Sequence, residues 1–223
     1  MARVLRDEPI RTFKARRRVT AGQAVAIERL LPTYGVDVTA PFDRVAVYAR
    51  SAPLVLEIGS GMGEATAAMA AADPARDLLA VEVHTPGVGS LLRRIESGGL
   101  TNVRVAEADG VEVLQDLIAP GSLDEVRVFF PDPWPKSRHS KRRLVSAAFA
   151  DLVADRLRPR GRLHVATDAG AYAREALRVL ADHPDFEVVS RDRGNRPVTR
   201  FEQQALDAGR DAHDIVAVRR PAG

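Results

Sequence analysis

The 223-residue sequence contains no cysteine, few aromatic residues and no long apolar run. The absence of cysteine excludes disulfide bonds and metal sites built on thiolates. No stretch approaches the ~20 apolar residues of a transmembrane helix, and the N-terminus is too polar for a signal peptide. We therefore expect a cytoplasmic protein that makes no membrane contact.

Metal-ligand patterns are also missing. The five histidines are scattered and none pairs at ligand spacing: His84, His139, His164, His183 and His213. We predict that the protein binds no metal. With 45% hydrophobic residues the chain can bury a full core. Its length fits one main domain, residues 51–223, preceded by a basic arm and a short helix in residues 1–50.

The basic charge is almost all arginine, because lysine occurs only at positions 14, 136 and 141. The net charge is +3, the sequence pI is about 9.7, and the cations gather at 11–18, 136–143, 158–162 and 191–200. A GC-rich genome would also favour arginine. However, arginine forks match phosphate and stack on bases, so this clustering favours a polyanionic partner.

Strand and helix patterns alternate from Pro53 onward. The expected strands are 54–58, 77–83, 102–106, 123–130, 162–167, 186–189 and 215–218, and the expected helices are 21–31, 64–72, 87–97, 111–118, 140–157 and 172–181. Strict alternation predicts an α/β fold with a doubly wound, mostly parallel, seven-stranded sheet. We expect the final strand to form an antiparallel edge. Thr20 should cap the first helix and Pro32 should end it.

A glycine-rich turn joins the strand at 54–58 to the helix at 64–72. Gly59, Gly61 and Gly63 have the spacing Gly-x-Gly-x-Gly, which differs from the dinucleotide-binding Gly-x-Gly-x-x-Gly. Glycine permits positive φ and a close approach by a ligand. Taken alone, the turn is equally typical of a tight connection that binds nothing.

Acidic residues near the ends of three strands strengthen the ligand interpretation. Glu57 precedes the glycines and could orient the turn or meet an ammonium group. Glu82 ends the second strand and could accept both ribose hydroxyls. Asp109 follows the third and could accept an adenine amino group, or simply cap a helix. Carboxylates repel a pyrophosphate and attract a sulfonium, so the series favours S-adenosylmethionine.

The sequence Pro-Asp-Pro-Trp-Pro-Lys at 131–136 follows the apolar pattern at 126–130. Its three prolines end ladder pairing and stiffen the turn, so they hold Asp132 and Trp134 at a strand end. Open α/β sheets place their chemistry there. With the cations at 136–143, this predicts a base pocket beside a phosphate backbone. The alternative is a proline-rich loop with a solvated basic face.

Together these stretches resemble the bacterial tRNA guanine-N7 methyltransferases, the TrmB family. The matching segments span nearly the whole chain in the right order: 11–13, 56–63, 82–89, 102–109, 129–143, 166–168 and 199–202. The Pro-Asp-Pro-Trp-Pro-Lys and Glu-Val-His-x-Pro-Gly-Val-Gly segments are highly specific. The glycine turn is shared by many methyltransferases.

The resemblance implies a class I, Rossmann-like methyltransferase domain over 51–223 that acts on guanine 46 of the tRNA variable loop. By motif match, S-adenosylmethionine would be held by Glu57, Gly59, Gly61, Gly63, Glu82 and Asp109, and Asp132 would be the catalytic acid. The expected substrate contacts are Lys136, Asp168, Thr199, Arg200, Phe201 and Glu202. The expected nucleic-acid contacts are Arg11, Lys14, Arg16, Arg17, Arg138, Lys141, Arg142 and Arg143.

The sequence departs from the family pattern at two places. Gly110 stands where alanine is usual, and the segment 203–210 lacks the usual Arg-Gly pair. The second departure leaves the contacts of the last loop open. The sequence also does not decide between a monomer and a homodimer.

The implied methyl transfer requires no side chain to remove a proton from the base. Guanine N7 has a free lone pair and no proton, so catalysis should depend on positioning and electrostatics. Asp132 could accept the guanine N1–H and N2–H groups and offset the positive charge that methylation creates. Trp134 is better explained by packing than by stacking on a base.

Two other functional classes remain open. An NAD-dependent oxidoreductase explains the sheet, the glycines and Glu82, but not Asp132 with its basic flank. A tRNA-binding module without catalysis requires the acidic residues to be incidental.

Overall fold

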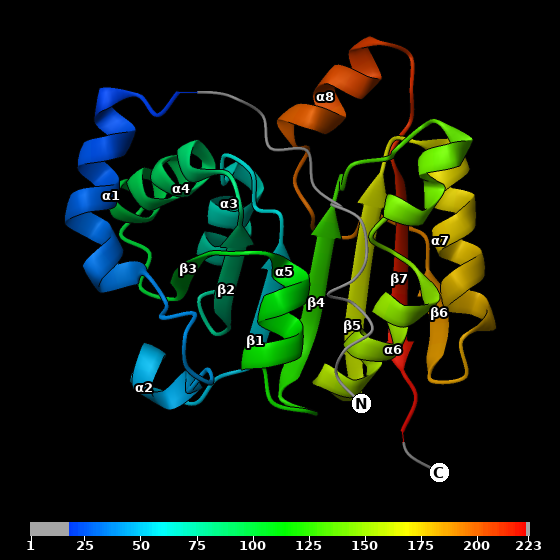
Figure 1. Ribbon diagram of the computed structural model, residues 1–223, viewed down its shortest axis with the longest axis horizontal. Coiled ribbons are helices and arrows are strands. Elements are labelled where there is room, and N and C mark those ends of the chain that lie inside the picture. The colour runs from blue at the N-terminus through cyan, green and yellow to red at the C-terminus, as the bar shows by residue number, and fades with distance from the viewer. Residues whose placement is uncertain (1–17, 222–223) are drawn as a thin grey trace. The chain divides into compact units, whose positions relative to one another are not determined.

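The computed structural model describes residues 18–221; the predicted arm contacts Arg11, Lys14, Arg16 and Arg17 lie outside the described residues. The strands are β1 Leu54–Ile58, β2 Asp77–Glu82, β3 Val103–Glu107, β4 Leu123–Phe129, β5 Leu157–Thr167, β6 Phe186–Ser190 and β7 His213–Arg219. They form one seven-stranded sheet in the order β3-β2-β1-β4-β5-β7-β6 (Figure 1). The predicted doubly wound, mostly parallel sheet is confirmed.

The helices alternate with these strands, as the sequence predicted. They are α1 Ala21–Tyr34, α2 Arg44–Tyr48, α3 Glu64–Ala72, α4 Thr85–Ser97, α5 Gly110–Glu112, α6 Ala147–Arg156, α7 Gly170–Asp182 and α8 Arg200–Asp207, with a π-helical turn η1 at Val113–Leu117 and a 3-10 helix η2 at Ser137–Arg142. Within residues 18–221, no helix has the length and apolar character needed to cross a membrane.

The position of β7 differs from the prediction. The final strand was expected at an edge, but β7 lies between β5 and β6 and is antiparallel to both. Residues 191–212 join β6 to β7, and this long connection does not force an edge position. The apolar residues 215–217 are buried, whereas Val189 of β6 is exposed. The continuous apolar run at 215–218 suits a strand covered on both faces, whereas β6, with Glu187 and Val189 exposed, forms the edge.

The described residues cluster into two compact units. One contains residues up to Ala119 together with Asn195–Thr199, and the other contains Pro120–Gly194 and Arg200 onward. In the first unit β1, β2 and β3 are parallel, α4 packs on β2 and β3, and α1 packs on α4 (Figure 1). The predicted domain boundary at residue 50 stays a prediction.

Helix α1 shows one confirmed prediction and one wrong one. Thr20 caps it as predicted, in a capping box where Thr20 Oγ1 accepts from the Gln23 backbone N–H at 3.3 Å. Pro32 does not end the helix, which continues to Tyr34. Leu30, Leu31 and Tyr34 pack on the core of this unit, so continuing the helix keeps apolar contacts that outweigh the hydrogen bond lost at proline.

The contact between α1 and α4 depends on Gln23 and Gly89. The Gln23 side-chain amide donates to Pro86 O at 3.0 Å and to Ser90 Oγ at 2.9 Å. A Cβ on Gly89 would lie 2.8 Å from the Gln23 Cβ atom. Glycine is therefore required for the two helices to approach this closely.

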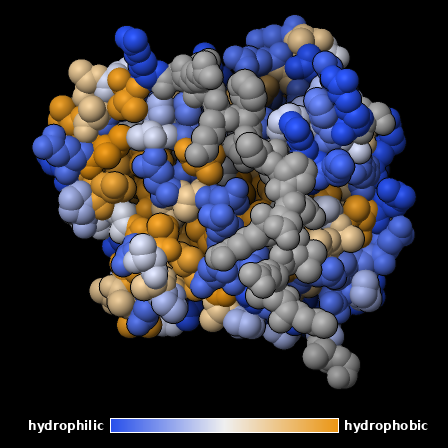
Figure 2. All heavy atoms as spheres, in the orientation of Figure 1, coloured by the Kyte–Doolittle hydropathy of each residue, from blue (hydrophilic) through white to orange (hydrophobic). Residues whose placement is uncertain are grey.

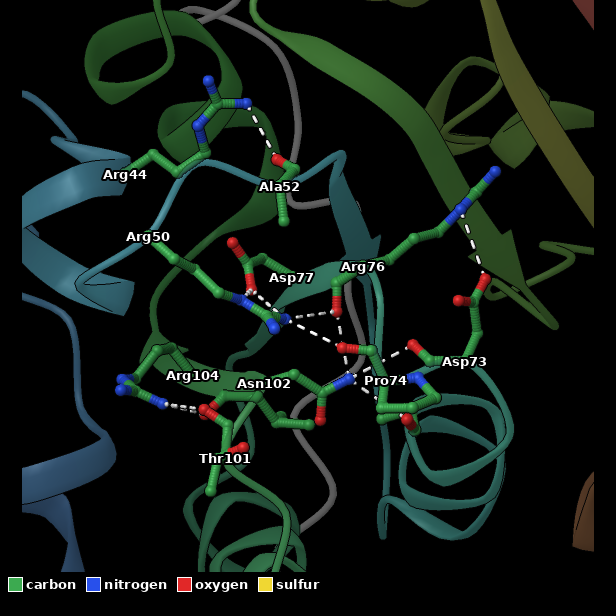
Figure 3. A network of polar contacts seen from close by, with 12 residues as sticks. Arg44, Arg50, Ala52, Asp73, Pro74, Arg76, Asp77, Thr101, Asn102 and Arg104 are labelled. Carbon is green, nitrogen blue, oxygen red and sulfur yellow. Dashed lines mark hydrogen bonds and ion pairs between the residues drawn. The ribbon is translucent and has the colours of Figure 1, made fainter.

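A polar network closes the amino ends of β2 and β3 in this unit (Figure 3). Asn102 donates its side-chain amide to the carbonyls of Ala70, Asp73 and Arg76 at 3.1, 3.3 and 3.0 Å. Arg50 Nε donates to Asp77 Oδ1 at 2.7 Å, which pairs a fully buried carboxylate. These side chains satisfy backbone groups and a buried charge, so they stabilise the fold at the amino ends of the strands.

In the second unit β4 and β5 are parallel, and α7 packs on β5, β6 and β7. The helix predicted over 140–157 is present, but its predicted start is wrong. Instead, η2 is followed by α6, which begins after the N-cap Ser146. Val145 N donates to the Tyr172 hydroxyl at 2.9 Å, and this contact with α7 interrupts helical bonding before Ser146. The buried positions of α6 are Phe149, Ala150, Val153 and Ala154.

Candidate active site

The glycine turn after β1 has the backbone conformation that its glycines predict. Gly59, Gly61 and Gly63 have φ values of 79°, 57° and 80°. A Cβ on Gly59 would meet nothing within 4 Å, so that side of the turn is open. A Cβ on Gly63 would lie 2.7 Å from Leu91 Cδ1 of α4. The turn is thus open at Gly59 and packed against α4 at Gly63.

Glu82, at the end of β2, holds this turn through hydrogen bonds. Its Oε2 accepts from Gly61 N at 2.7 Å and its Oε1 accepts from His84 N at 2.8 Å. The residue is 8% exposed. Burial raises the pKa of the carboxyl group, and the backbone N–H donors partly oppose this shift. The sequence predicted that Glu82 binds the ribose hydroxyls, but it gave no sign of the hydrogen bond from Gly61 N to Glu82.

Helix α4 supports the same turn with three residues on one helical face. Gly87 allows close approach, because a Cβ there would lie 2.4 Å from Gly61 O. Leu91 lies against Gly63, and Arg94 Nε donates to Met62 O at 3.0 Å. Arg94 also pairs with Glu64 at 2.7 Å. The spacing 87, 91, 94 is the signal that could have identified this support from sequence.

Gly87→Ala should therefore disturb the turn. The new Cβ must displace the Gly61 carbonyl, so we expect a loss of about 1–3 kcal/mol in unfolding free energy, with weaker S-adenosylmethionine binding. Denaturant unfolding and calorimetry measure the two effects. The control is Gly22→Ala in α1, whose Cβ would meet only Arg93 Nη1 and Cζ, at 3.7 and 3.9 Å. Equal stability of the two variants would contradict the packing argument.

Glu57 and Asp109 lie in the same unit and are already engaged in local hydrogen bonds. Glu57 is buried, and its Oε1 accepts from Thr66 Oγ1 of α3 at 3.0 Å. Asp109 caps α5, with its Oδ1 accepting from Val111 N at 2.8 Å. Gly110, the departure from the family pattern, allows contact with β1: a Cβ there would lie 2.5 Å from Ile58 Cγ2. The change to glycine therefore has a packing explanation.

Asp132 lies on the strained loop that follows β4, and its side chain is half-buried. Phe130 and Trp134 flank it with φ values of 51° and 42°. For non-glycine residues such conformations cost about 1–3 kcal/mol each and persist only where the surroundings enforce them. Phe130 N donates to Ala166 O of β5 at 2.7 Å, which fixes the start of the loop.

The basic run after the loop divides into two groups. Arg142 stacks on the Trp134 ring at 4.9 Å, and His139 meets the ring edge at 5.8 Å. These contacts agree with packing as the role of Trp134. Arg143 is bound to the loop itself, a role that the prediction of nucleic-acid contact did not include. Lys136, Arg138 and Lys141 are exposed.

Asp168, at the end of β5, is paired with a residue that sequence reasoning missed. Arg210 donates to Asp168 Oδ2 from Nε at 3.2 Å and from Nη2 at 3.1 Å. Arg210 follows Gly209 in the segment whose contacts the resemblance left open. The structure therefore brings this last loop to a predicted substrate residue.

The residues predicted at 199–202 differ in accessibility. Phe201 of α8 is 62% exposed and Arg200 is exposed, whereas Glu202 is fully buried and pairs with Arg193. Thr199 is half-buried. On the face drawn in Figure 2, mostly hydrophilic side chains lie over α8. Phe201 and Arg200 can meet a ligand, whereas Glu202 holds the helix in place.

Comparison with known proteins identifies the family. Residues 51–215 match the family described as "Putative methyltransferase". A tRNA (guanine-N(7)-)-methyltransferase of Streptomyces avermitilis is 51% identical over 94% of this chain and 75% of its own. That of Nitrosospira multiformis is 48% identical over 93% of both chains. The chain belongs to the tRNA (guanine-N7-)-methyltransferase family.

The fold agrees with membership of the tRNA (guanine-N7-)-methyltransferase family. The solved 16S rRNA methyltransferase KamB superposes with a TM-score of 0.57 at 17% identity, over 81% of this chain and 95% of that one. The cofactor of the family's methyltransferase fold is S-adenosylmethionine. The turn fits it, because Glu57, Glu82 and Asp109 suit a sulfonium better than a pyrophosphate and the Gly59 side is open.

Two of the five histidines pair with an aspartate. His164 Nε2 lies 2.8 Å from Asp214 Oδ1, and His183 Nε2 lies 3.0 Å from Asp151 Oδ1. In the described part of the chain, no group of three or more His, Cys, Asp or Glu could hold a metal ion.

Proposed function

We propose that this protein transfers the methyl group of S-adenosylmethionine to N7 of guanine 46 in the tRNA variable loop. The observation that carries the proposal is the order of elements after β4: Asp132 lies in the loop that follows this strand, and the next element, η2, carries the exposed cations Arg138 and Lys141. An acid can bind the guanine edge and the cations can bind the adjacent phosphates. A cytoplasmic location, where tRNA is found, belongs to the same proposal.

The residues of this chain act by binding and orienting. Bound S-adenosylmethionine supplies the methyl group, which guanine N7 takes as the C–S bond breaks. N7 carries a lone pair and no proton, so no side chain has to act as a base. Asp132 accepts the guanine N1–H and N2–H groups and offsets the positive charge left on the purine. Glu82 keeps the glycine turn in position through Gly61.

A tritiated-methyl assay on unmodified tRNA tests the proposal directly. We expect one methyl group per tRNA, and nuclease mapping should place it at guanine 46. A tRNA with adenosine at that position serves as the control and should stay unlabelled. Label at another nucleotide would contradict the site, and a lack of transfer would favour a binding module. Calorimetric binding of NAD in place of S-adenosylmethionine would favour an oxidoreductase.

The affinity for tRNA should fall steeply with salt, because cations that bind phosphates release counterions. Each phosphate contact contributes about 0.7–0.9 to the slope of log K against log salt concentration. Deleting residues 1–18 removes the predicted contacts Arg11, Lys14, Arg16 and Arg17, so the slope should decrease. Filter binding over a salt series measures it. If the slope and the affinity both stay unchanged, the arm does not contact tRNA.

A further inference from the structure

We propose that Arg143 is a positioning residue that fixes the Asp132 loop, residues 130–136, against α7, and is not a ligand of tRNA phosphate. The inference rests on the proposed function, because loop position matters for the reaction only if Asp132 acts on guanine. Arg143 belongs to the basic run 136–143, for which the sequence predicts contacts with the RNA substrate.

The Asp132 loop needs an external hydrogen-bond donor. Pro131, Pro133 and Pro135 have no N–H group, so they cannot extend the ladder between β4 and β5. Their carbonyls and that of Trp134 remain acceptors. With Phe130 and Trp134 both at positive φ, the loop does not adopt a conformation that its own backbone favours. Contacts from elsewhere must maintain it.

Arg143 provides these contacts with three of its nitrogen atoms. Nε donates to Pro133 O at 3.0 Å and Nη2 donates to Trp134 O at 3.3 Å. Nη1 forms an ion pair with Glu175 of α7. The Arg143 side chain is only 10% exposed, so its guanidinium is enclosed between the loop and the helix.

The α7 side of this contact is also rigid. The Arg143 guanidinium lies over the ring of Tyr172, 5.5 Å from its centroid. Tyr172 is buried, and its hydroxyl accepts from Val145 N at 2.9 Å. Tyr172 and Glu175 are three residues apart and share one face of α7. This helix begins at Gly170, two residues after Asp168, so Arg143 ties the Asp132 loop to the helix that follows the predicted substrate residue Asp168.

The geometry requires arginine and disfavours a phosphate role. A guanidinium has a planar fork of donors that can reach two carbonyls and a carboxylate at once, whereas a lysine ammonium is a single charged point. A phosphate would have to compete with Glu175 for Nη1. Arg138 and Lys141, by contrast, are exposed and keep their charge toward solvent.

Arg143→Lys keeps the charge and removes the fork, and Glu175→Gln keeps Arg143 and removes its anchor. Both should lower the single-turnover rate of methyl transfer at saturating tRNA by about 10²-fold, as a misplaced reacting group does. The tRNA Kd and its salt slope should stay within about twofold of wild type. Arg178→Ala, which removes an exposed arginine from the same helix, is the matched control and should leave the rate unchanged.

The outcomes distinguish a failure of the positioning role of Arg143 from a failure of the proposed methylation of guanine N7. A wild-type rate in Arg143→Lys, together with a smaller salt slope in Arg143→Ala, would make Arg143 a phosphate ligand and overturn the inference. A wild-type rate in Glu175→Gln would also overturn it. If the wild-type protein fails to methylate guanine N7, the proposed function itself fails. Slower transfer in both variants, with less than additive loss in the double variant, supports positioning.

Discussion

Asp132→Asn should lower the rate of methyl transfer about 10²–10³-fold, the usual loss when a group that stabilises developing charge is removed. The substitution keeps the size of the side chain and removes its negative charge. The affinity for S-adenosylmethionine should not change, because Asp132 is not among the residues expected to bind it, which are the glycines of the turn with Glu57, Glu82 and Asp109. Single-turnover kinetics at saturating tRNA and calorimetry with the cofactor measure the two quantities.

Two controls decide what Asp132 does. Asp182→Asn, at the exposed end of α7, removes an equal charge and should leave the rate unchanged. Because guanine N7 needs no deprotonation, the wild-type rate should show no base with a pKa of about 7. A near-wild-type rate in Asp132→Asn would make Asp132 a loop-shaping residue. Thermal instability that accompanies the loss of activity would point to the same structural role.

Glu82→Ala should weaken S-adenosylmethionine binding about 10- to 100-fold, which corresponds to the loss of about 1.5–3 kcal/mol from a charged hydrogen bond. Two causes add: the predicted ribose contacts disappear, and Gly61 N loses its acceptor. The affinity for tRNA should change little. Calorimetry with S-adenosylmethionine and filter binding with tRNA test the two statements.

The comparison variant is Glu96→Gln on α4, which removes an exposed carboxylate that pairs with Arg29. It should leave cofactor affinity unchanged. If Glu82→Ala also binds S-adenosylmethionine as wild type does, Glu82 is not part of the cofactor site and only shapes the turn.

Lowering the pH should weaken cofactor binding and increase the contribution of Glu82 to stability, because both depend on the protonation of its carboxyl group. Burial raises its pKa above the ordinary 4.5. As the pH falls through the raised pKa, the carboxyl gains a proton and loses an acceptor, so cofactor affinity should fall. The folded state binds this proton more tightly than the unfolded state does. The contribution of Glu82 to stability is therefore full below pH 4.5 and is lost as the pH rises through the raised value.

The difference between wild type and Glu82→Ala isolates this contribution. Cofactor affinity and unfolding free energy are both measured from pH 7 downward. As the pH falls, the wild-type affinity should approach that of the variant, and the stability contribution of Glu82 should increase. A constant affinity ratio across the range would exclude titration of Glu82.

Local patterns carried much of the prediction of fold and site. The strand, turn and helix around Gly59, Gly61 and Gly63 are contiguous in sequence, and the glycines do adopt positive φ. The acids Glu82 and Asp109 could be singled out because Glu82 ends one strand pattern and Asp109 follows the next. Their hydrogen bonds to Gly61 and Val111 could not, because a side chain that seeks a ligand and one that caps a backbone group look the same in sequence.

The wrong predictions arose where distant segments compete with local preference. The pattern over 140–157 is helical, but the contact between Val145 and Tyr172 delays α6 to Ala147. Pro32 is a helix breaker, yet core contacts of Tyr34 extend α1 past it. The strand β7 takes an interior position because its long connection permits this and its apolar residues favour it.

The sequence by itself determined the class of fold, the family and the glycine turn with acidic residues near it. These depend on periodicity and on residues that are neighbours in the chain. Only the tertiary structure decided how the cations at 136–143 divide. Arg142 and Arg143 pack on the loop and α7, whereas Arg138 and Lys141 face solvent. The physical reason is that the exposure of a long charged side chain depends on which elements fold against it, and the sequence of a basic run contains no such information.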